Sequence, residues 1–416
     1  MADRMLVNYW YANPVGHAVE GLRYAFGYQV ASPGAKVSLL LSDATAVELA
    51  RCCPFLDAVY TVSYPFGKAG SDPRAALAHV PREWDWVIDN FRVQLTSHER
   101  TPGFKAFFDA AHEHFRPRKG LTLTGDEPPP YSADRQLRLE LPDDAVAAAR
   151  QRLGGRRAIS AVLAGQSDSR ASYPSTASWR LLLSRLSERY PEAAIVLIGK
   201  LGGDAKTSTT AMTRAEVDRL LADVPAAIDA FDIPLLEQLA LVEASDLFVS
   251  PHTGFAFAAL AVGTPWLALS GGVWHEYFFN GVPFHSLVPS PRKYPSFTPA
   301  ATETVDDVDG EGPRIPSMTL GRFREDLPEF LDAAERLIAR RISYEDALAA
   351  YFPRLADAYG GDTSCIFSFD NVHARYVAAP RVASTTARMV LPSESVVRRR
   401  LRRFVGTRLS LRSLRR

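Results

Sequence analysis

The sequence has 416 residues, 47% of them hydrophobic, and a formal net charge of +1. This length exceeds one ordinary domain core, and the apolar content excludes global disorder. Residues 391–416 hold nine arginines and one glutamate, a net charge of +8, which leaves a net charge of −7 on the rest of the chain. The composition predicts a folded, acidic body with a basic tail, and an acidic body argues against a nucleic-acid partner.

The cysteines and the apolar runs indicate the cellular compartment. Cys52, Cys53 and Cys365 form neither a disulfide framework nor a zinc-ligand spacing. The first residues lead into a strand-like run without a cleavage site, and the most apolar stretch, 255–269, is interrupted by glycine and proline and is too short to span a bilayer. We therefore expect a cytoplasmic protein.

In the first part of the chain, short apolar runs alternate with helical periods, which is the pattern of a parallel sheet. The expected strands are 6–11, 36–41, 58–62 and 84–89, and the expected helices are 18–30, 44–52 and 104–115. Three consecutive prolines, 128–130, then predict a stiff linker.

The same alternation restarts after the linker. The expected strands are 158–163, 194–198, 247–249 and 266–269, and the expected helices are 143–153, 178–190, 234–242, 254–261, 326–341 and 344–359. Residues 289–316, rich in Pro, Thr and Asp, predict a long surface loop. The predicted class is α/β with two doubly wound units. The predicted parts are an N-terminal domain 1–127, a linker 128–133, a C-terminal domain 134–342, a helical extension 343–390 and a tail 391–416.

The strongest chemical motif follows the expected strand 247–249. There Pro251-His252-Thr253-Gly254 forms a turn before a helix of small residues, and Gly263-Thr264-Pro265 precedes the next strand. Such a turn presents backbone N–H groups and a helix N-terminus to a diphosphate. Gly254 would allow close backbone approach, and Thr253 would add a hydroxyl donor. A plain capped βα turn is the alternative.

Further candidates for donor binding follow other strands, because ligands of open α/β sheets bind beyond the carboxyl ends of the strands. Arg170 would form charge-assisted bonds to phosphate, unless its loop is only solvated. The full set of these candidates is Gln166, Ser167 and Arg170 after strand 158–163, Lys200 after strand 194–198, and Gly271, Gly272, His275 and Glu276 after strand 266–269.

The order of elements around residues 244–269 resembles the C-terminal half of heptosyltransferase-like (GT9) glycosyltransferases. The segment from Tyr173-Pro174 through Trp179 to the strand 195–198 and its following glycine is similar to another part of that family, as is Trp84-Asp85-Trp86-Val87-Ile88-Asp89. The resemblance covers about residues 6–290. It implies a GT-B fold, in which two Rossmann-like domains face a cleft, the N-terminal one binding a hydroxyl acceptor and the C-terminal one a nucleotide sugar. It also implies transfer with inversion.

The first loop resembles a second family. Gly16-His17, at the start of the first helix, looks like the Gly-His of GT1-type glycosyltransferases, in which the histidine deprotonates the acceptor hydroxyl. An imidazole titrates near neutral pH and suits this role. Glu20, one turn later, is the alternative base or an orienting group. A histidine satisfied within its own turn is the non-catalytic alternative.

Departures from the GT9 pattern keep two other functions open. The turn at 251–254 lacks the family's acidic residue, no histidine follows it, and Ala171 stands where a lysine is usual. The alternatives are a sugar-nucleotide epimerase or hydrolase on the same fold, and a non-catalytic glycosyltransferase-like partner protein.

The sequence contains no metal-binding motif. His112 and His114 flank Glu113 without zinc-site spacing, so surface or cleft positions are expected for both. The expected enzyme is metal-independent and needs no cofactor beyond its nucleotide-sugar substrate, because a helix dipole and side chains neutralise the leaving diphosphate.

The tail carries one more prediction. In residues 396–416, Leu401, Phe404 and Val405 recur at helical spacing among arginines, so the tail can form an amphipathic basic helix. An anionic membrane surface is the expected partner, which would place the enzyme at the inner face of the membrane. A solvated tail, or one docked on the acidic body, is the alternative.

Overall fold

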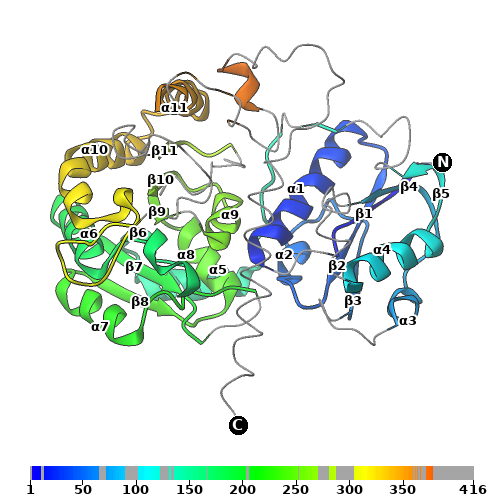
Figure 1. The fold of residues 1–416 in the computed structure, drawn as a ribbon, viewed down its shortest axis with the longest axis horizontal. Helices are drawn as coiled ribbons and strands as arrows, with labels where there is room; N and C mark the ends of the chain where they lie inside the picture. Colours follow the sequence, from blue (N-terminus) through cyan, green and yellow to red (C-terminus); the bar gives the residue numbers. More distant parts are fainter. Residues whose placement is uncertain are drawn as a thin grey trace, which may run out of the picture.

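The computed structural model describes residues 2–10, 14–64, 72–89, 102–121, 131–132, 135–165, 167–202, 206–251, 253–269, 281–286, 304–358, 361, 363, 366 and 372–377. Two α/β halves lie side by side (Figure 1). Each half is built on a sheet whose paired strands are all parallel.

The N-terminal half has a five-stranded sheet of order β3-β2-β1-β4-β5. Its strands are β1 (Arg4–Asn8), β2 (Lys36–Ser42), β3 (Ala58–Val62), β4 (Glu83–Asp89) and β5 (Arg116–Leu121), and its helices are α1 (Val15–Ala31), α2 (Glu48–Arg51), α3 (Pro73–Leu77) and α4 (Pro102–His114). The strands expected at 36–41, 58–62 and 84–89 are present. β1 begins and ends earlier than expected, and α2 is only four residues long.

The C-terminal half has a six-stranded sheet of order β11-β10-β9-β6-β7-β8. Its strands are β6 (Arg157–Val162), β7 (Ala193–Gly199), β8 (Ala227–Phe231), β9 (Leu247–Pro251), β10 (Trp266–Leu269) and β11 (Phe284–Ser286). Its helices are α5 (Asp143–Leu153), α6 (Thr176–Arg189), α7 (Arg214–Asp223), α8 (Leu235–Glu243), α9 (Gly254–Leu260), α10 (Leu320–Ile338) and α11 (Tyr344–Ala358), with short 3₁₀ turns at Ser167–Ser172, Pro316–Met318 and Val372–Arg375.

Helix α10 starts six residues before the expected helix at 326, and its caps give the reason. The Thr319 side chain accepts a hydrogen bond from the backbone N–H of Arg322, and Asp307 accepts one from Leu320. Side-chain acceptors of this kind satisfy N–H groups that lack partners within the helix. Asp307 lies in the segment 289–316 that the sequence predicts as a long surface loop, so this loop contributes directly to the start of the helix.

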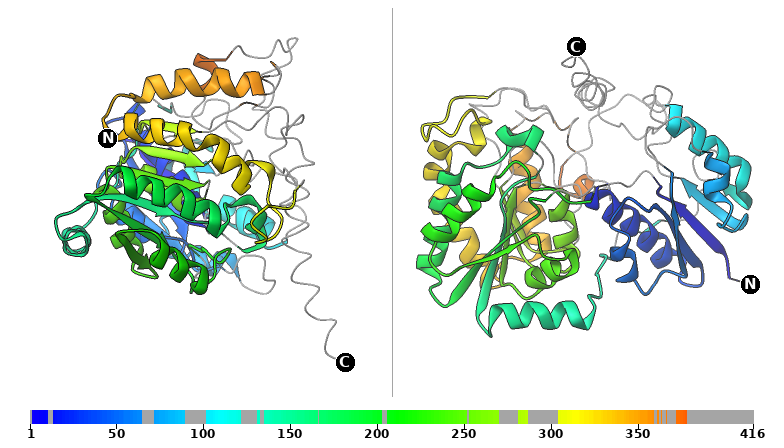
Figure 2. Two further views of the ribbon diagram at one scale, coloured as in Figure 1. Left: turned by 90° about the vertical axis from the view of Figure 1, so that its left-hand side faces the viewer. Right: turned by 90° about the horizontal axis from the view of Figure 1, so that it is seen from below.

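Two hydrophobic clusters hold these layers together. The larger cluster runs through the cores of both halves, and the smaller one fills the space between the N-terminal sheet and α4. Helices α10 and α11 lie on the C-terminal half, away from the N-terminal sheet (Figures 1 and 2). Within the described residues, no helix is both long and apolar enough to cross a membrane.

Candidate functional site

Each sheet has a topological switch point, the place where the strand order reverses. In the C-terminal half it lies between β6 and β9, and in the N-terminal half between β1 and β4. Ligands of open α/β sheets bind outside the carboxyl ends of the strands at such points. β9 leads into α9 and β6 leads into the 3₁₀ turn that contains Arg170, so both predicted donor loops start at the C-terminal switch point.

The first turns of α1 and α9 meet at the join of the two halves (Figure 1). A Cβ atom built on Gly16 of α1 would lie 3.1 Å from the Cα atom of Gly254 in α9. The N–H of Val15 donates to the carbonyl of Lys206 in the C-terminal half at 2.9 Å, and the Lys206 ammonium pairs with Glu48 at 3.0 Å. Backbone packing, a hydrogen bond and an ion pair thus join the halves beside the predicted donor turn.

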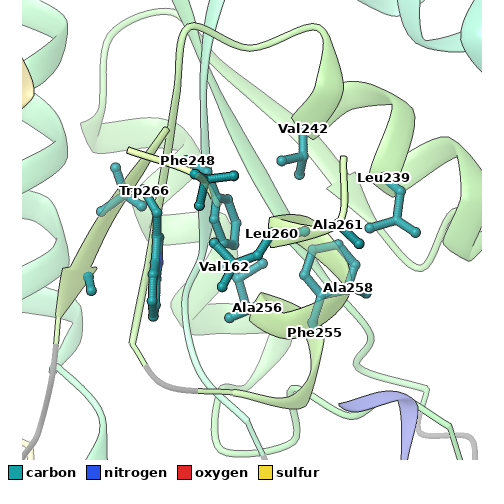
Figure 3. Close-up of a cluster of buried hydrophobic side chains, with 14 of the residues drawn as sticks. Val162, Leu239, Val242, Phe248, Phe255, Ala256, Ala258, Leu260, Ala261 and Trp266 are labelled. Atoms are coloured by element: carbon teal, nitrogen blue, oxygen red, sulfur yellow. The ribbon is translucent and has the colours of Figure 1, made fainter. Parts of the chain in front are cut away.

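The position of α9 is set by a buried apolar cluster. Phe255, Ala258 and Leu260 pack with Phe248 of β9 and with neighbours from β6, α8 and β10 (Figure 3). At the start of the helix, Thr253 is 7% exposed and its hydroxyl oxygen accepts a hydrogen bond from the N–H of Ala256 at 3.2 Å. The Thr253 hydroxyl therefore acts as an N-cap.

The Gly263-Thr264-Pro265 segment that follows α9 has a structural explanation. Gly263 has a φ of 89°, a left-handed conformation that favours glycine. The Thr264 hydroxyl donates to the carbonyl of Val242 at 2.7 Å and ties the turn to the end of α8. The residues that carry much of the family resemblance at this position therefore hold the turn in place.

The two candidate bases lie on α1. His17 is in the first turn, half-buried, and its backbone N–H donates to the carbonyl of Pro14. Glu20 is one turn later and only 4% exposed. His17 therefore lies next to Gly16, whose contact with Gly254 joins the halves, whereas Glu20 lies deeper in the N-terminal half.

Arg170 lies after β6 as predicted, but its guanidinium is already engaged. It forms an ion pair with Glu216 of α7 and donates to the carbonyl of Ala211 at 2.6 Å. The hydrogen bond to Glu216 raises the pKa of the guanidinium. Glu216 is itself the third residue of a capping box with Thr213. This network fastens the start of α7 to the loop after β6.

Lys200 directly follows β7, at the carboxyl edge of the same sheet. Its backbone N–H donates to the Thr209 hydroxyl at 2.6 Å, and its carbonyl accepts from the Thr209 N–H at 2.8 Å. A Cβ on the preceding Gly199 would lie 2.3 Å from the Phe231 ring, so only glycine fits there. Lys200 is half-buried at the edge of the C-terminal sheet.

The remaining donor candidates cannot be placed in the same way. The backbone of Ser167 lies in the 3₁₀ turn after β6. The others, Gln166, His252, Gly271, Gly272, His275 and Glu276, lie outside the described residues. In the part of the chain that the structure describes, no three His, Cys, Asp or Glu side chains gather in a way that could hold a metal ion. Metal independence stays a prediction.

The sequence did not single out a polar chain at the N-terminal switch point. Asn8, the last residue of β1, donates from Nδ2 to Oδ1 of Asp89, the last residue of β4, at 2.7 Å. Oδ2 of Asp89 bonds to Nε2 of His112 in α4 at 2.5 Å. In the sequence, Asp89 belongs only to a segment that resembles the GT9 family, and His112 lacks zinc-site spacing. One signal could have indicated this group of residues: Asp89 is the last residue of a predicted strand.

Comparison with known proteins gives matches to solved structures only. No family model matches the sequence, and no curated protein matches it. A glycosyl transferase family 9 protein from Veillonella parvula is similar with a TM-score of 0.56 and 14% identity, over 81% of this chain and 98% of that chain. ADP-heptose LPS heptosyltransferase II from E. coli is similar with a TM-score of 0.49 and 13% identity, over 80% of this chain and 99% of that chain.

A UDP-GlcNAc 2-epimerase from Neisseria meningitidis is also similar, with a TM-score of 0.38 and 12% identity, over 86% of this chain and 98% of that chain. At such identities a likeness shows the fold alone, and of these three structures only the Veillonella protein has a TM-score above 0.5. Together with the two parallel sheets, the match to the Veillonella structure confirms the predicted fold class and the resemblance. The chain has a GT-B-like fold of two α/β halves, each built on a parallel sheet, similar to that of the Veillonella family 9 structure.

Proposed function

We propose that the protein transfers a sugar from a nucleotide diphosphate sugar to a hydroxyl acceptor. The observation that supports this most is the meeting of α1 and α9, the helices that follow β1 and β9 at the two switch points, in a fold shared with a family 9 glycosyltransferase. A donor at the C-terminal switch point and an acceptor at the N-terminal one would then lie close together.

The proposed reaction follows from the residues at this join. His17 accepts the proton of the acceptor hydroxyl, and the oxygen attacks the anomeric carbon of the donor sugar with inversion. The nucleoside diphosphate leaves with the electron pair of the broken C–O bond. Backbone N–H groups at Thr253 and Gly254 stabilise its charge, so that no metal ion is required.

The test is a thermal-shift panel with ADP, GDP, UDP, dTDP and CMP, alone and as their sugar conjugates. A nucleotide at 100 times its Kd stabilises the folded state by about 2.7 kcal/mol, which a melting curve resolves. We expect one base to be selected, and we expect Thr253→Val to remove that shift. Thr253→Ser, which keeps the hydroxyl and the cap, is the matched control.

The same panel separates the two alternatives. If no nucleotide shifts the melting temperature, the protein is a non-catalytic partner with a degenerate donor site. If a nucleotide sugar binds and free sugar is released without any acceptor, the epimerase or hydrolase alternative holds. Transfer that requires an added hydroxyl acceptor supports the glycosyltransferase.

We further propose that residues 396–416 bring the enzyme to an anionic membrane surface. Each arginine near such a surface contributes about 1 kcal/mol, and the effect is screened by salt. Vesicles with 30% phosphatidylglycerol should co-sediment with the full chain at low salt but not with a chain that ends at residue 390. Equal sedimentation of both chains would exclude the tail as the anchor.

A further inference from the structure

The polar chain Asn8–Asp89–His112 combines deep burial with one accessible end. The side chain of Asp89 is fully buried, and Asn8 is 0% exposed. The side chain of His112, at the other end, is 35% exposed. A carboxylate is rarely buried unless it is paired, and both oxygens of Asp89 have partners. The buried pair thus holds an imidazole that reaches solvent.

The position of Asn8, Asp89 and His112 in the fold favours ligand binding. Asn8 ends β1 and Asp89 ends β4, the two strands on either side of the N-terminal switch point. His112 is brought there by α4, whose Phe107 stacks on Trp10 with ring centroids 4.0 Å apart. The aromatic cluster around Trp10, which follows β1 by two residues, therefore holds α4 against this part of the N-terminal half.

The hydrogen-bond pattern fixes the tautomer of the neutral imidazole. An ionised carboxylate only accepts hydrogen bonds, so Nε2 of His112 carries the proton that it donates to Asp89. Nδ1 is then a lone-pair acceptor, and a carboxylate on the opposite nitrogen increases its basicity. The hydrogen bond to Asp89 raises the pKa of His112, and the charges of Asp89 and Asp109 raise it further against the effect of burial.

Asn8 supplies a second hydrogen-bond acceptor, in addition to that of His112. Asn8 turns its amide nitrogen to Asp89, which leaves Oδ1 as its other polar atom. This Oδ1 is buried and has no hydrogen-bond partner among the described residues. Buried polar atoms without partners are few in native proteins, and each calls for an explanation such as a ligand or a water molecule.

We propose that Asn8, Asp89 and His112 form a subsite of the N-terminal half that binds hydroxyl groups of a sugar acceptor. This inference rests on the proposed glycosyl transfer and assigns the acceptor's position within it. His112 accepts a hydrogen bond from one hydroxyl through Nδ1, and Asp89 and Asn8 are positioning residues. His17 remains the base.

The charges around His112 favour a hydroxyl ligand over an anionic one. Asp89 on β4 neutralises the imidazolium, Asp109 on α4 adds negative charge, and Lys105 is paired with Asp109 at 2.5 Å. The arginine of α3 nearby, Arg74, is likewise paired, with Glu113 at 2.7 Å. Among the described residues, these pairings leave no net positive charge around His112 to attract an anion.

The test uses the full chain labelled with ¹⁵N-histidine and the methyl glycosides of glucose, galactose, mannose and N-acetylglucosamine as probes. We expect at least one glycoside to shift the Nδ1 resonance of His112, assigned through His112→Gln. Because only neutral Nδ1 accepts a hydrogen bond, the affinity should rise as the pH rises through the raised pKa. Asp89→Asn should weaken binding at least tenfold, and His79→Gln, an exposed histidine in the same half, should not.

Three results would overturn the subsite. They are the absence of any glycoside effect on His112, a response to inorganic phosphate that weakens with rising pH, and unchanged glycoside affinity in His112→Gln. The glycoside affinity of His112→Gln decides the question even if Asp89→Asn does not fold. Because no nucleotide is present, failure of donor binding in the thermal-shift panel would leave this outcome unaffected, so the two proposals fail separately.

Discussion

Gly16 and Gly254 lie against each other where the halves join: a Cβ on Gly16 would stand 3.1 Å from the Gly254 Cα atom and 3.1 Å from the Phe257 ring. Because one of these neighbours is backbone, an added methyl group can be accommodated only if α1 and α9 move apart. The two loops that the sequence predicts to bind ligands therefore meet in one helix-to-helix junction.

Gly16→Ala should lower the stability of the folded chain through this contact. Overpacking a tight site typically costs about 1–3 kcal/mol, so the midpoint of thermal unfolding should fall. Gly34→Ala is the matched control, because a Cβ at Gly34 meets nothing within 4 Å and should change little. Equal melting temperatures for both variants would contradict the junction.

If His17 is the base, its substitution should slow sugar transfer without affecting nucleotide binding. His17→Gln should lower the rate of sugar transfer by about 10²–10⁴-fold, the usual contribution of a general base. The shift in melting temperature caused by the nucleotide should persist, because His17 belongs to the acceptor half. Transfer at the wild-type rate would exclude His17 as the base and move attention to Glu20.

Arg170 and Glu216 should behave as one unit in stability measurements. Arg170→Met and Glu216→Gln should each destabilise the chain, and the double variant should be little worse than either alone, with a coupling of about 0.5–3 kcal/mol. Chemical denaturation of the four proteins measures this cycle. If instead the nucleotide shift disappears in Arg170→Met but not in Glu216→Gln, Arg170 contacts the donor.

Glu329 predicts a loss of stability in acid. Hydrogen bonds from His285 and Arg354 lower its pKa from the ordinary value of 4.5 to about 2. A carboxylate with a lowered pKa stabilises the fold above its ordinary pKa, and this contribution is lost as the pH falls toward the folded value. The difference in melting temperature between wild type and Glu329→Gln should therefore shrink as the pH falls from 4.5 to 2. A difference independent of pH would contradict the pairing.

Part of the fold was predictable because it depends on local patterns. Alternating apolar runs and helical periods gave most strands of both sheets and the α/β class. The turn before α9 was also predictable, since a threonine just before a helical apolar pattern indicates a helix start, and Thr253 is the N-cap. Short or polar elements were missed. β5 contains three basic residues and a proline, and α7 carries five charged residues, so neither stands out as a buried segment.

The sequence by itself therefore determined which elements exist and which residues follow each strand, because periodicity and turn chemistry act between near neighbours. Only the tertiary structure decided which of those residues meet. Arg170 and Glu216 are 46 positions apart, and Asn8 and Asp89 are 81 positions apart. For Asn8 and Asp89 the partners are chosen by the strand order β3-β2-β1-β4-β5, which brings the ends of β1 and β4 together. For Arg170 and Glu216 they are chosen by the packing of α7 beside the loop after β6. In both pairs the burial of the carboxylate makes it costly to leave it unpaired.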